Sequence, residues 1–336
     1  MNRKIKVAIL GCGRISKKHI EAIADNSSKF DLTALCDENK IKLDKTKINI
    51  IKFSSIKKLL NSNIPYDLVS ICTPSGLHKT HAVQCLKKGI NVLIEKPMAL
   101  TNKDAQIIIN EGTRSKKKIF ICLQNRFNPT IKLLKKTLDE KKLGKIFFIN
   151  VNILWNRDQS YYDQDNWRGT KKMDGGALMN QSIHFIDLVI WLFGSAKKIQ
   201  ILRSRLARKI ETEDSACINM LLKKNILCSI SSTMLVSQEN YEGSITIIAE
   251  KGTIKIGGIA LNEIIKWNIN NKEMSIKEKK KINYNLKSVY GSGHKYIYEE
   301  IYKSLNNQKS DAVNGKDGIL SVNFIDKLYK KNNLLL

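Results

Sequence analysis

The sequence predicts an α/β protein in two domains: an N-terminal doubly wound parallel sheet and a C-terminal α+β domain with an open, largely antiparallel sheet. Short apolar runs alternate with amphipathic stretches in the first third, and a glycine-rich turn follows the first run. After about residue 123, consecutive apolar runs replace this alternation. Because 336 residues exceed one ordinary core, we expect domains at 1–123 and 124–336.

The first domain is built from short apolar runs separated by amphipathic stretches that begin with polar residues. Helices are predicted over Leu77–Lys87 and Asn102–Arg114. The predicted strands are Lys4–Leu10, Leu32–Cys36, Leu68–Cys72, Val92–Ile94 and Ile119–Leu123. This alternation is typical of parallel strands joined by crossover helices.

The second domain contains more strands than helices. A helix is predicted from Asn128-Pro129 to near Gly144, and a second leads from Gly175-Gly176 through Leu192. Two more, Lys295–Leu305 and Gly318–Tyr329, close the chain. The predicted strands are Ile146–Leu154, Ile199–Leu206, Ala216–Leu222, Ile226–Met234, Ser244–Ala249, Gly252–Ile256 and Glu263–Ile269. Because such a sheet leaves one face exposed, we expect that face to make a homodimer or homotetramer.

The charge is strongly basic, with 58 Lys and Arg against 31 Asp and Glu, a net +27. This excess indicates an anionic partner: nucleic acid, a membrane surface or a charged small substrate. Lys, Ile and Asn are abundant throughout, however, and a compositional bias produces the same excess. The lysines are spread along the chain without an RNA-binding signature, so we do not expect a nucleic-acid partner.

Targeting and cysteine patterns favour the cytoplasm. No apolar run reaches the roughly 18 residues of a membrane span, and Gly11 interrupts the first run too early for a signal peptide. The seven cysteines form no C-x-x-C pair and most lie in apolar runs. We therefore expect buried free thiols, with neither disulfides nor a metal site.

A phosphate-binding turn is predicted at Gly11-Cys12-Gly13-Arg14-Ile15-Ser16, which follows a strand and opens a helix. Its first glycine permits a tight turn, and its second lets the backbone approach a pyrophosphate at the helix N-terminus. Ser16 stands where Gly or Ala is usual, and is small enough for close packing. Asp37 ends the second strand, where a carboxylate accepts ribose hydroxyls and repels a 2′-phosphate, which favours NAD over NADP.

Four further stretches carry a family resemblance. They are Thr73-Pro74 followed by His78, Glu95-Lys96-Pro97, Gly175-Gly176, and Asn180 followed by His184 and Asp187. With the turn, they resemble the glucose-fructose oxidoreductase and inositol dehydrogenase family over nearly the whole chain. The resemblance implies a Rossmann domain, NAD-dependent oxidation of a sugar or polyol, and a cofactor site made of Gly11, Gly13, Arg14, Ile15, Asp37, Thr73, Pro74, His78, Glu95, Lys96 and Gln124, with Glu95 on the nicotinamide ribose.

Oxidation of a secondary alcohol requires a base for the hydroxyl proton and a positive group for the developing alkoxide. Lys96 lies just past the carboxyl end of a strand, where open α/β sheets bind ligands. His184 titrates near neutrality, and from Asn180 the spacing of four predicts that both side chains share one helix face. We assign the base to His184 and leave Lys96 as its alternative.

Asn180 departs from the family, most of which carries Asp at this position. An Asp stabilises a protonated His184 more strongly than a neutral amide does. We therefore interpret Asn180 as a substrate contact.

A narrower resemblance is carried by the stretches around Arg126, Trp155, Trp167 and Leu178. They resemble the UDP-N-acetyl-2-amino-2-deoxyglucuronate dehydrogenases, which oxidise the C3 hydroxyl before a transaminase installs an amine for surface polysaccharides. This implies an anionic nucleotide-sugar substrate, and leaves open whether NADH is released or reoxidised in place with 2-oxoglutarate. The expected substrate contacts are Lys96, Arg126, Asn128, Arg157, Tyr161, Tyr162, Trp167, Arg168, Asn180, Gln181 and His184, in which arginines pair oxyanions and aromatic rings pack on uracil or sugar.

Two other functions remain open at this point. The chain could be another sugar or polyol dehydrogenase of the same family, which a substrate panel would distinguish. It could also be a regulator that binds NAD without turnover, although the presence of both Lys96 and His184 disfavours this.

Overall fold

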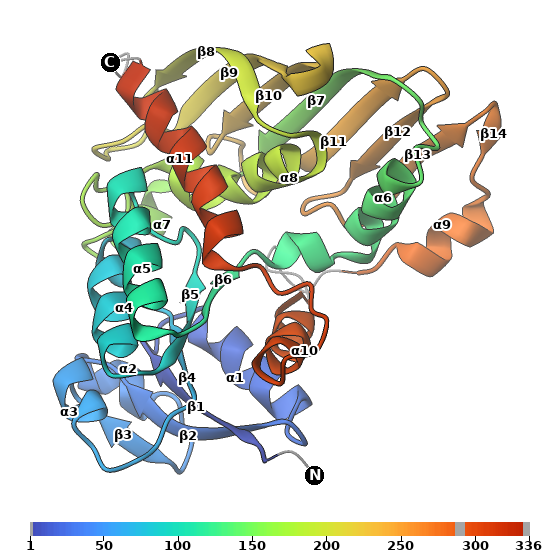
Figure 1. Cartoon of the computed structure of the whole chain (residues 1–336). Coiled ribbons are helices and arrows are strands. Elements are labelled where there is room, and N and C mark those ends of the chain that lie inside the picture. Colours follow the sequence, from blue (N-terminus) through green and yellow to red (C-terminus); the bar gives the residue numbers. More distant parts are fainter. Residues whose placement is uncertain (1–2, 286–292, 332–336) are drawn as a thin grey trace. The chain divides into compact units, whose positions relative to one another are not determined.

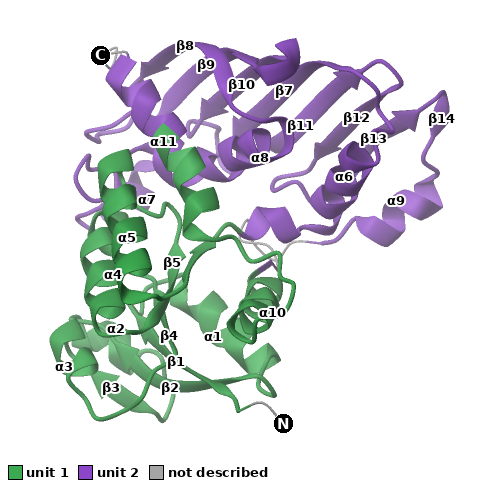
Figure 2. Cartoon of the chain, in the orientation of Figure 1, with its two compact units in different colours: residues 1–123, 294–323 green, residues 124–293, 324–336 purple. Residues whose placement is uncertain are grey.

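The computed structural model describes residues 3–285 and 293–331. The chain divides into two compact units (Figures 1 and 2): 1–123 with 294–323, and 124–293 with 324–336. The chain first passes from one unit to the other at residue 123, where the sequence suggested a boundary. Residues 294–323, however, group with the first unit, although we expected them in the second.

The first unit contains a six-stranded sheet in the order β3-β2-β1-β4-β5-β6. All of its strand pairs are parallel, which confirms the doubly wound sheet. The strands are β1 Ile5–Leu10, β2 Phe30–Cys36, β3 Ile51–Phe53, β4 Leu68–Ile71, β5 Asn91–Glu95 and β6 Ile119–Cys122. The winding reverses between β1 and β4, so the carboxyl ends of these two strands flank the crevice in which such sheets bind ligands.

Helices join these strands. They are α1 Ser16–Asp25, α2 Lys40–Asp44, α3 Ile56–Leu60, α4 His78–Lys87 after a 3-10 turn at Ser75–Leu77, α5 Asn102–Ser115, and α10 Gly293–Leu305. Helix α11, Gly315–Lys331, contributes its first part to this unit and its end to the other. Strand β3 and helices α2 and α3 were not predicted, because three to five residues are too few for a periodic pattern.

Helix α10 belongs to the first unit because Tyr298 is buried there. Its ring lies 5.3 Å from that of Phe30, and its hydroxyl is 2.8 Å from Ser70 Oγ and 3.0 Å from His19 Nδ1. The segment before α11 then pairs with β6, where Ile121 N donates to Val313 O at 2.8 Å. Apolar spacing revealed these helices but not the sheet on which they pack.

The second unit contains an eight-stranded sheet in the order β14-β13-β12-β11-β7-β10-β9-β8. Apart from the parallel pair β7–β10, its pairs are antiparallel, as predicted. The strands are β7 Ile146–Leu154, β8 Ala196–Ser204, β9 Ser215–Leu222, β10 Leu227–Thr233, β11 Glu242–Ala249, β12 Gly252–Gly257, β13 Glu263–Ile269 and β14 Lys272–Glu273.

One face of this sheet carries α8. Phe185 lies against Gly243 of β11 and 5.7 Å from the Trp155 ring, and Ser182 Oγ is 2.7 Å from Ser232 Oγ of β10. The helical segments of the unit are a 3-10 turn at Gln124–Phe127, α6 Pro129–Asp139, α7 Gln159–Asp163, a π-helical turn at Leu178–Ser182, α8 Ile183–Phe193, a 3-10 turn at Lys223–Asn225, and α9 Ile276–Ile282. Among the helices of the described residues, none is long and apolar enough to cross a bilayer.

The other face of the sheet stays accessible. Leu202, 66% exposed, is the register partner of Cys217, and Leu227, 55% exposed, is that of Phe148. Polar side chains such as Ser231, opposite Cys217, lie between them. Cys217 is exposed, whereas the other six cysteines are buried free thiols.

Candidate functional site

The turn after β1 adopts a backbone that requires glycine at its first position. Gly11 has a φ of +95°, and an added Cβ would lie 2.7 Å from the carbonyl carbon of Cys72 and 2.8 Å from Thr73 N. Nothing lies within 4 Å of a Cβ added to Gly13, so the backbone there is open to a ligand. Ser16 Oγ donates to Gly13 O at 2.7 Å. This arrangement fits a pyrophosphate at the start of α1, which no side chain of the described residues caps.

Asp37 is bound to this turn. Its Oδ2 accepts a hydrogen bond from Cys12 N at 2.7 Å, and its Oδ1 accepts one from Asn39 N at 2.8 Å. Each carboxylate oxygen has a second lone pair, so the group can still accept ribose hydroxyls. Arg14 is exposed and Ile15 half-buried at the same turn.

His78 connects the turns that follow β4 and β5. Its Nδ1 lies 2.7 Å from Pro97 O and its Nε2 lies 2.8 Å from Thr73 O. Pro74 immediately precedes the 3-10 turn that leads to this histidine. Burial lowers the pKa of His78. The predicted cofactor residue His78 therefore lies between the carbonyl groups of Thr73 and Pro97, and its neutral imidazole donates a hydrogen bond to one of them.

Glu95 ends β5 at this edge, and Lys96 follows it. Glu95 is buried, and its carboxylate lies 2.9 Å from the ring of His19, while the side chain of Lys96 is half-buried. The edge thus brings together the predicted turn, Thr73, Pro74, Glu95 and Lys96, all within the first unit.

His184 lies on α8 of the second unit, 7% exposed, with its Nε2 3.5 Å from Gln124 Nε2. Gln124, expected at the cofactor, thus contacts the predicted base. We expected Asn180 and His184 on one face of a regular helix. Instead, Asn180 lies in the π-helical turn before α8. The extra residue of such a turn changes which side chains align, and these turns are frequent at functional sites.

A buried carboxylate that the sequence did not single out, Asp174, holds this turn. Asp174 is buried and accepts hydrogen bonds from the Asn180 side-chain amide and, at 2.8 Å, from Gly169 N. The Asn180 amide is therefore oriented by Asp174, which also fixes the loop that carries Arg168.

Glu213 holds the start of the same turn. Its Oε1 accepts hydrogen bonds from Leu178 N at 3.0 Å and from the Tyr329 hydroxyl at 2.7 Å. A Cβ on Gly176, whose φ is +107°, would lie 2.7 Å from both partners of that second bond. Burial raises the pKa of Glu213. Of the Gly175-Gly176 pair, Gly176 therefore leaves the space that this carboxyl group occupies.

Four predicted substrate residues form one cluster, which we call the arginine–tyrosine cluster: Arg157, Tyr161, Arg168 and Gln181. Arg168 Nη1 donates to the Tyr161 hydroxyl at 2.7 Å, and Gln181 Nε2 donates to it at 3.3 Å. The guanidiniums of Arg157 and Arg168 lie 5.2 and 4.5 Å from the Tyr161 ring centre. Because Gln181 adjoins Asn180 in the π-helical turn, the cluster is continuous with the residues before His184.

A basic hollow of about 610 Å³ opens beside this cluster, lined by one carboxylate, Glu211, and by four cationic side chains: Arg168, Arg205, Arg208 and Lys209. Arg208 Nε donates to Arg157 O at 2.7 Å, which ties the hollow to the cluster. Asp214, fully buried, accepts hydrogen bonds from the backbone N–H groups of residues 206–208 and so shapes the loop. Sequence reasoning missed Arg205, Arg208 and Lys209; the available signal was three cations within five residues after β8.

The remaining predicted substrate contacts are Arg126, Asn128, Tyr162 and Trp167, and the first three are buried. Arg126 Nε and Nη2 each donate to Asp187 at 2.7 Å, in a buried pair that leaves Arg126 little freedom to bind a ligand. Asn128 Nδ2 donates to Ala260 O at 3.3 Å. Tyr162 is buried edge-on to Tyr161, and the Trp167 ring lies 4.6 Å from the Arg168 guanidinium. We attribute to Arg126, Asn128 and Tyr162 the support of the site.

Comparison with known families matches both parts of the chain. Residues 5–122 match the model of an oxidoreductase family's NAD-binding Rossmann fold, and residues 135–333 match that family's C-terminal alpha/beta domain. Among curated proteins, the glucose-6-phosphate 3-dehydrogenase of Bacillus subtilis is 25% identical over 266 residues, which cover 74% of this chain and 73% of the relative.

Two solved structures are similar over almost the entire chain. The WlbA dehydrogenase from Bordetella pertussis, in complex with NADH and UDP-GlcNAcA, is 36% identical with a TM-score of 0.93, covering 98% of this chain and 96% of that one. The WlbA dehydrogenase from Chromobacterium violaceum, in complex with the same two molecules, is 35% identical with a TM-score of 0.91, covering 98% and 94%.

Proposed function

The chain belongs to the Gfo/Idh/MocA family of NAD-dependent oxidoreductases, and we propose that it oxidises the C3 hydroxyl of UDP-N-acetyl-2-amino-2-deoxyglucuronate (UDP-GlcNAcA) to the 3-keto sugar, in the synthesis of a surface-polysaccharide precursor. The observation that carries the proposal is the arginine–tyrosine cluster with its basic hollow, next to the turn that leads to His184. The likeness to dehydrogenases solved with UDP-GlcNAcA supports it.

The charge of the hollow matches this substrate. A nucleotide sugar acid carries negative charge on its diphosphate and on its carboxylate, and guanidinium groups pair such oxyanions through parallel N–H donors. In the proposed complex, Arg168, Arg205, Arg208 and Lys209 hold the anionic groups. Gln181 and Asn180 hold the sugar, which places its reacting hydroxyl toward His184.

We assign each unit its own part in the proposed chemistry. In the first unit, the Gly11–Ser16 turn and Asp37 would hold NAD, and the cofactor would supply the hydride acceptor for C3. Lys96 holds the reacting oxygen and stabilises its negative charge as the proton departs. His184, with Gln124 against its ring, accepts that proton.

A second candidate function is oxidation of a different anionic sugar, such as a sugar phosphate. The relative named glucose-6-phosphate 3-dehydrogenase favours it, because four cations would also bind a phosphate ester. Neutral polyols such as inositol carry no negative charge for these cations to bind.

A panel of substrates with NAD⁺ distinguishes these candidates, with NADH formation as the readout. We expect turnover of UDP-GlcNAcA, with kcat/KM at least about a hundredfold above that of glucose 6-phosphate or inositol. Neither of these compounds carries both a diphosphate and a carboxylate, so each would lose about two charge-assisted hydrogen bonds to the cations of the hollow. A reversed order would overturn the proposal. Adding 2-oxoglutarate to purified enzyme tests whether bound NADH is reoxidised in place.

A further inference from the structure

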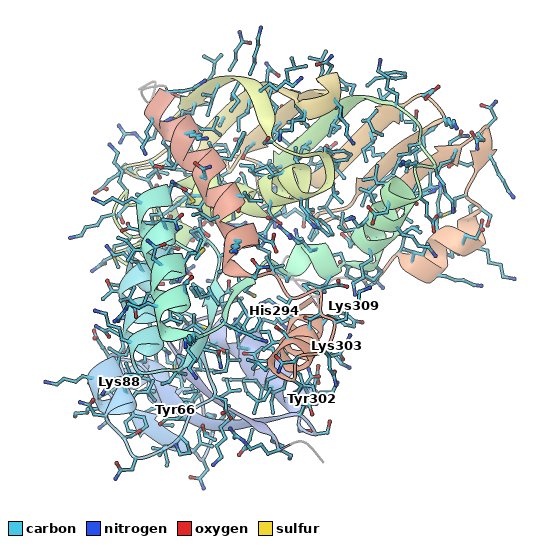
Figure 3. The ribbon with its side chains drawn as sticks, viewed as in Figure 1. Tyr66, Lys88, His294, Tyr302, Lys303 and Lys309 are labelled. Atoms are coloured by element: carbon cyan, nitrogen blue, oxygen red, sulfur yellow. The ribbon has the colours of Figure 1, made fainter. Side chains whose placement is uncertain are left out.

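The end of β5 is surrounded by buried histidines that the function above does not use. Glu95 lies at this end, 5% exposed, next to Lys96. Its Oε1 is 2.9 Å from His19 Nε2 on α1 and 3.4 Å from His294 Nε2 at the start of α10. Figure 3 labels His294 at this helix start. Both imidazoles are buried, at 0% and 3% exposure.

The carboxylate is thereby engaged on both oxygens. Glu95 Oε2 accepts a hydrogen bond from the backbone N of Lys96 at 3.1 Å, while Oε1 faces the two imidazoles. The opposite side of the His19 ring is fixed as well, because His19 Nδ1 lies 3.0 Å from the Tyr298 hydroxyl. That hydroxyl in turn lies 2.8 Å from Ser70 Oγ on β4.

These contacts form one buried chain, which we call the Glu95 lock: Ser70, Tyr298, His19, Glu95 and His294. It connects β4, α10, α1 and β5 at the edge where the cofactor binds. Hydrogen bonds join Ser70, Tyr298, His19 and Glu95, whereas His294 contacts Glu95 at 3.4 Å and its ring nitrogens have no hydrogen-bond partner among the described residues. Buried hydrogen-bonded networks favour one arrangement of the elements that they join.

We propose that Glu95 is a positioning residue for Lys96, held in place by His19 with His294 beside it. Its carboxylate fixes the backbone from which the Lys96 side chain extends. This inference rests on the proposed function only for the role that it gives to Lys96.

A metal ion is the alternative occupant, because donor atoms of His19, Glu95, Cys122 and His294 all lie within 4.8 Å of one another. The 2.9 Å contact between His19 and Glu95 is a hydrogen-bond distance. Burial raises the pKa of Cys122 and keeps it a protonated thiol, which is a poor metal ligand. The Glu95 lock therefore explains the cluster without an ion.

The experiment compares Glu95→Gln, His19→Asn and the double variant. Glu111→Gln on α5 is the matched control, because Glu111 is also a buried glutamate but pairs with Arg114 and not with a histidine. NAD⁺ affinity is measured by calorimetry, unfolding by urea, and kcat with UDP-GlcNAcA. We expect each single variant to lower kcat about tenfold or more, with NAD⁺ affinity within about threefold of the parent. Each single variant should lower the equilibrium constant for folding. The double variant should lower it about tenfold less than the product of the two single effects, because contacting residues are coupled.

Three results would overturn the inference. The first is an NAD⁺ affinity that falls more than about tenfold in Glu95→Gln but not in His19→Asn, as expected for a ribose ligand. The second is that the effects of Glu95→Gln and His19→Asn on the unfolding equilibrium add up in the double variant, while kcat per folded enzyme is unchanged in each variant. The third is a stoichiometric metal in the purified protein that Cys122→Ser removes. Affinity, coupling and metal content need no sugar, so a failure of the proposed function would be seen separately, as a wild type that binds NAD⁺ but leaves UDP-GlcNAcA unreacted.

Discussion

The side-chain amide of Asn180 donates a hydrogen bond to the buried carboxylate of Asp174. Beside Asp174, a second carboxylate at position 180 would be repelled. An amide satisfies Asp174 without adding charge, which accounts for Asn at this position.

Replacing Asn180 with Asp should therefore make activity depend on pH in a new way. Two adjacent carboxylates raise one of their pKa values. Above that raised pKa both are ionised and the turn before His184 is displaced; below it one is protonated and the hydrogen bond returns. We expect kcat/KM to fall roughly tenfold to a hundredfold at alkaline pH, from the loss of a charge-assisted hydrogen bond, and to recover in mild acid. A pH profile of kcat/KM measures this.

The exchange variant, Asp174→Asn with Asn180→Asp, is the matched control. It keeps one carboxylate and one amide with their positions reversed, so most of the lost activity should return at alkaline pH. If the exchange is no better than the single variant, the pairing is not what matters at position 180.

Lys96→Met should abolish turnover while the protein still binds NAD⁺. Losing a positioned acid–base or alkoxide-stabilising group costs about 10²–10⁴-fold in kcat. Lys88→Met is the control, since Lys88 pairs with exposed Asn61 in the same unit. Single-turnover kinetics and calorimetry give the two quantities, and a kcat within about threefold of the parent would remove Lys96 from the chemistry.

Arg168→Ala should weaken substrate binding more than it slows the reaction. One guanidinium hydrogen bond to an anion contributes about 1.5–3 kcal/mol, so KM for UDP-GlcNAcA should rise roughly tenfold to a hundredfold with little change in kcat. Arg114→Ala, which removes a surface arginine paired with Glu111, should leave KM unchanged. A large fall in kcat at constant KM would instead indicate that Arg168 acts in the transition state.

Asp37→Asn should reduce the preference for NAD⁺ over NADP⁺. The amide oxygen can still accept from Cys12 N, so the turn keeps its support while the negative charge is lost. We expect the ratio of kcat/KM values for the two cofactors to fall by about tenfold or more, the size of one charge-assisted hydrogen bond. An unchanged ratio would mean that another group selects the cofactor.

The exposed face of the larger sheet should bury itself against a second copy of the chain. Cys217 lies on this face beside Leu202, and the other six cysteines are buried, so native alkylation reports on Cys217 alone. We expect slow alkylation and an oligomer by light scattering, with Leu202→Glu giving monomers and fast alkylation. A wild-type monomer at micromolar concentration would contradict this.

Local sequence patterns predicted many of the elements that carry the candidate cofactor and substrate residues. The glycine turn, Lys96 at the end of β5 and strands β7 and β13 follow from apolar runs and their punctuation, which are properties of neighbouring residues. Pairings between distant residues have no such signal. Arg126 and Asp187 lie 61 positions apart, so nothing local showed that the arginine would bind an internal carboxylate.

The same limit explains the largest difference in organisation. The spacing of apolar residues in α10 predicted a helix, but only the packing of Tyr298 on Phe30, and its bonds to His19 and Ser70, shows that the helix returns to the first unit. The histidines beside Glu95 had no local signal either, since they come from α1 and α10.

The most direct test of the account is one reaction. Purified protein is mixed with NAD⁺ and UDP-GlcNAcA deuterated at C3, and mass spectrometry follows both the sugar and the cofactor. The account predicts a 3-keto nucleotide sugar, deuterium on the reduced cofactor, and neither product with Lys96→Met. Bound NAD⁺ with an unchanged sugar, or deuterium that remains on the sugar while NADH forms, would contradict oxidation at C3.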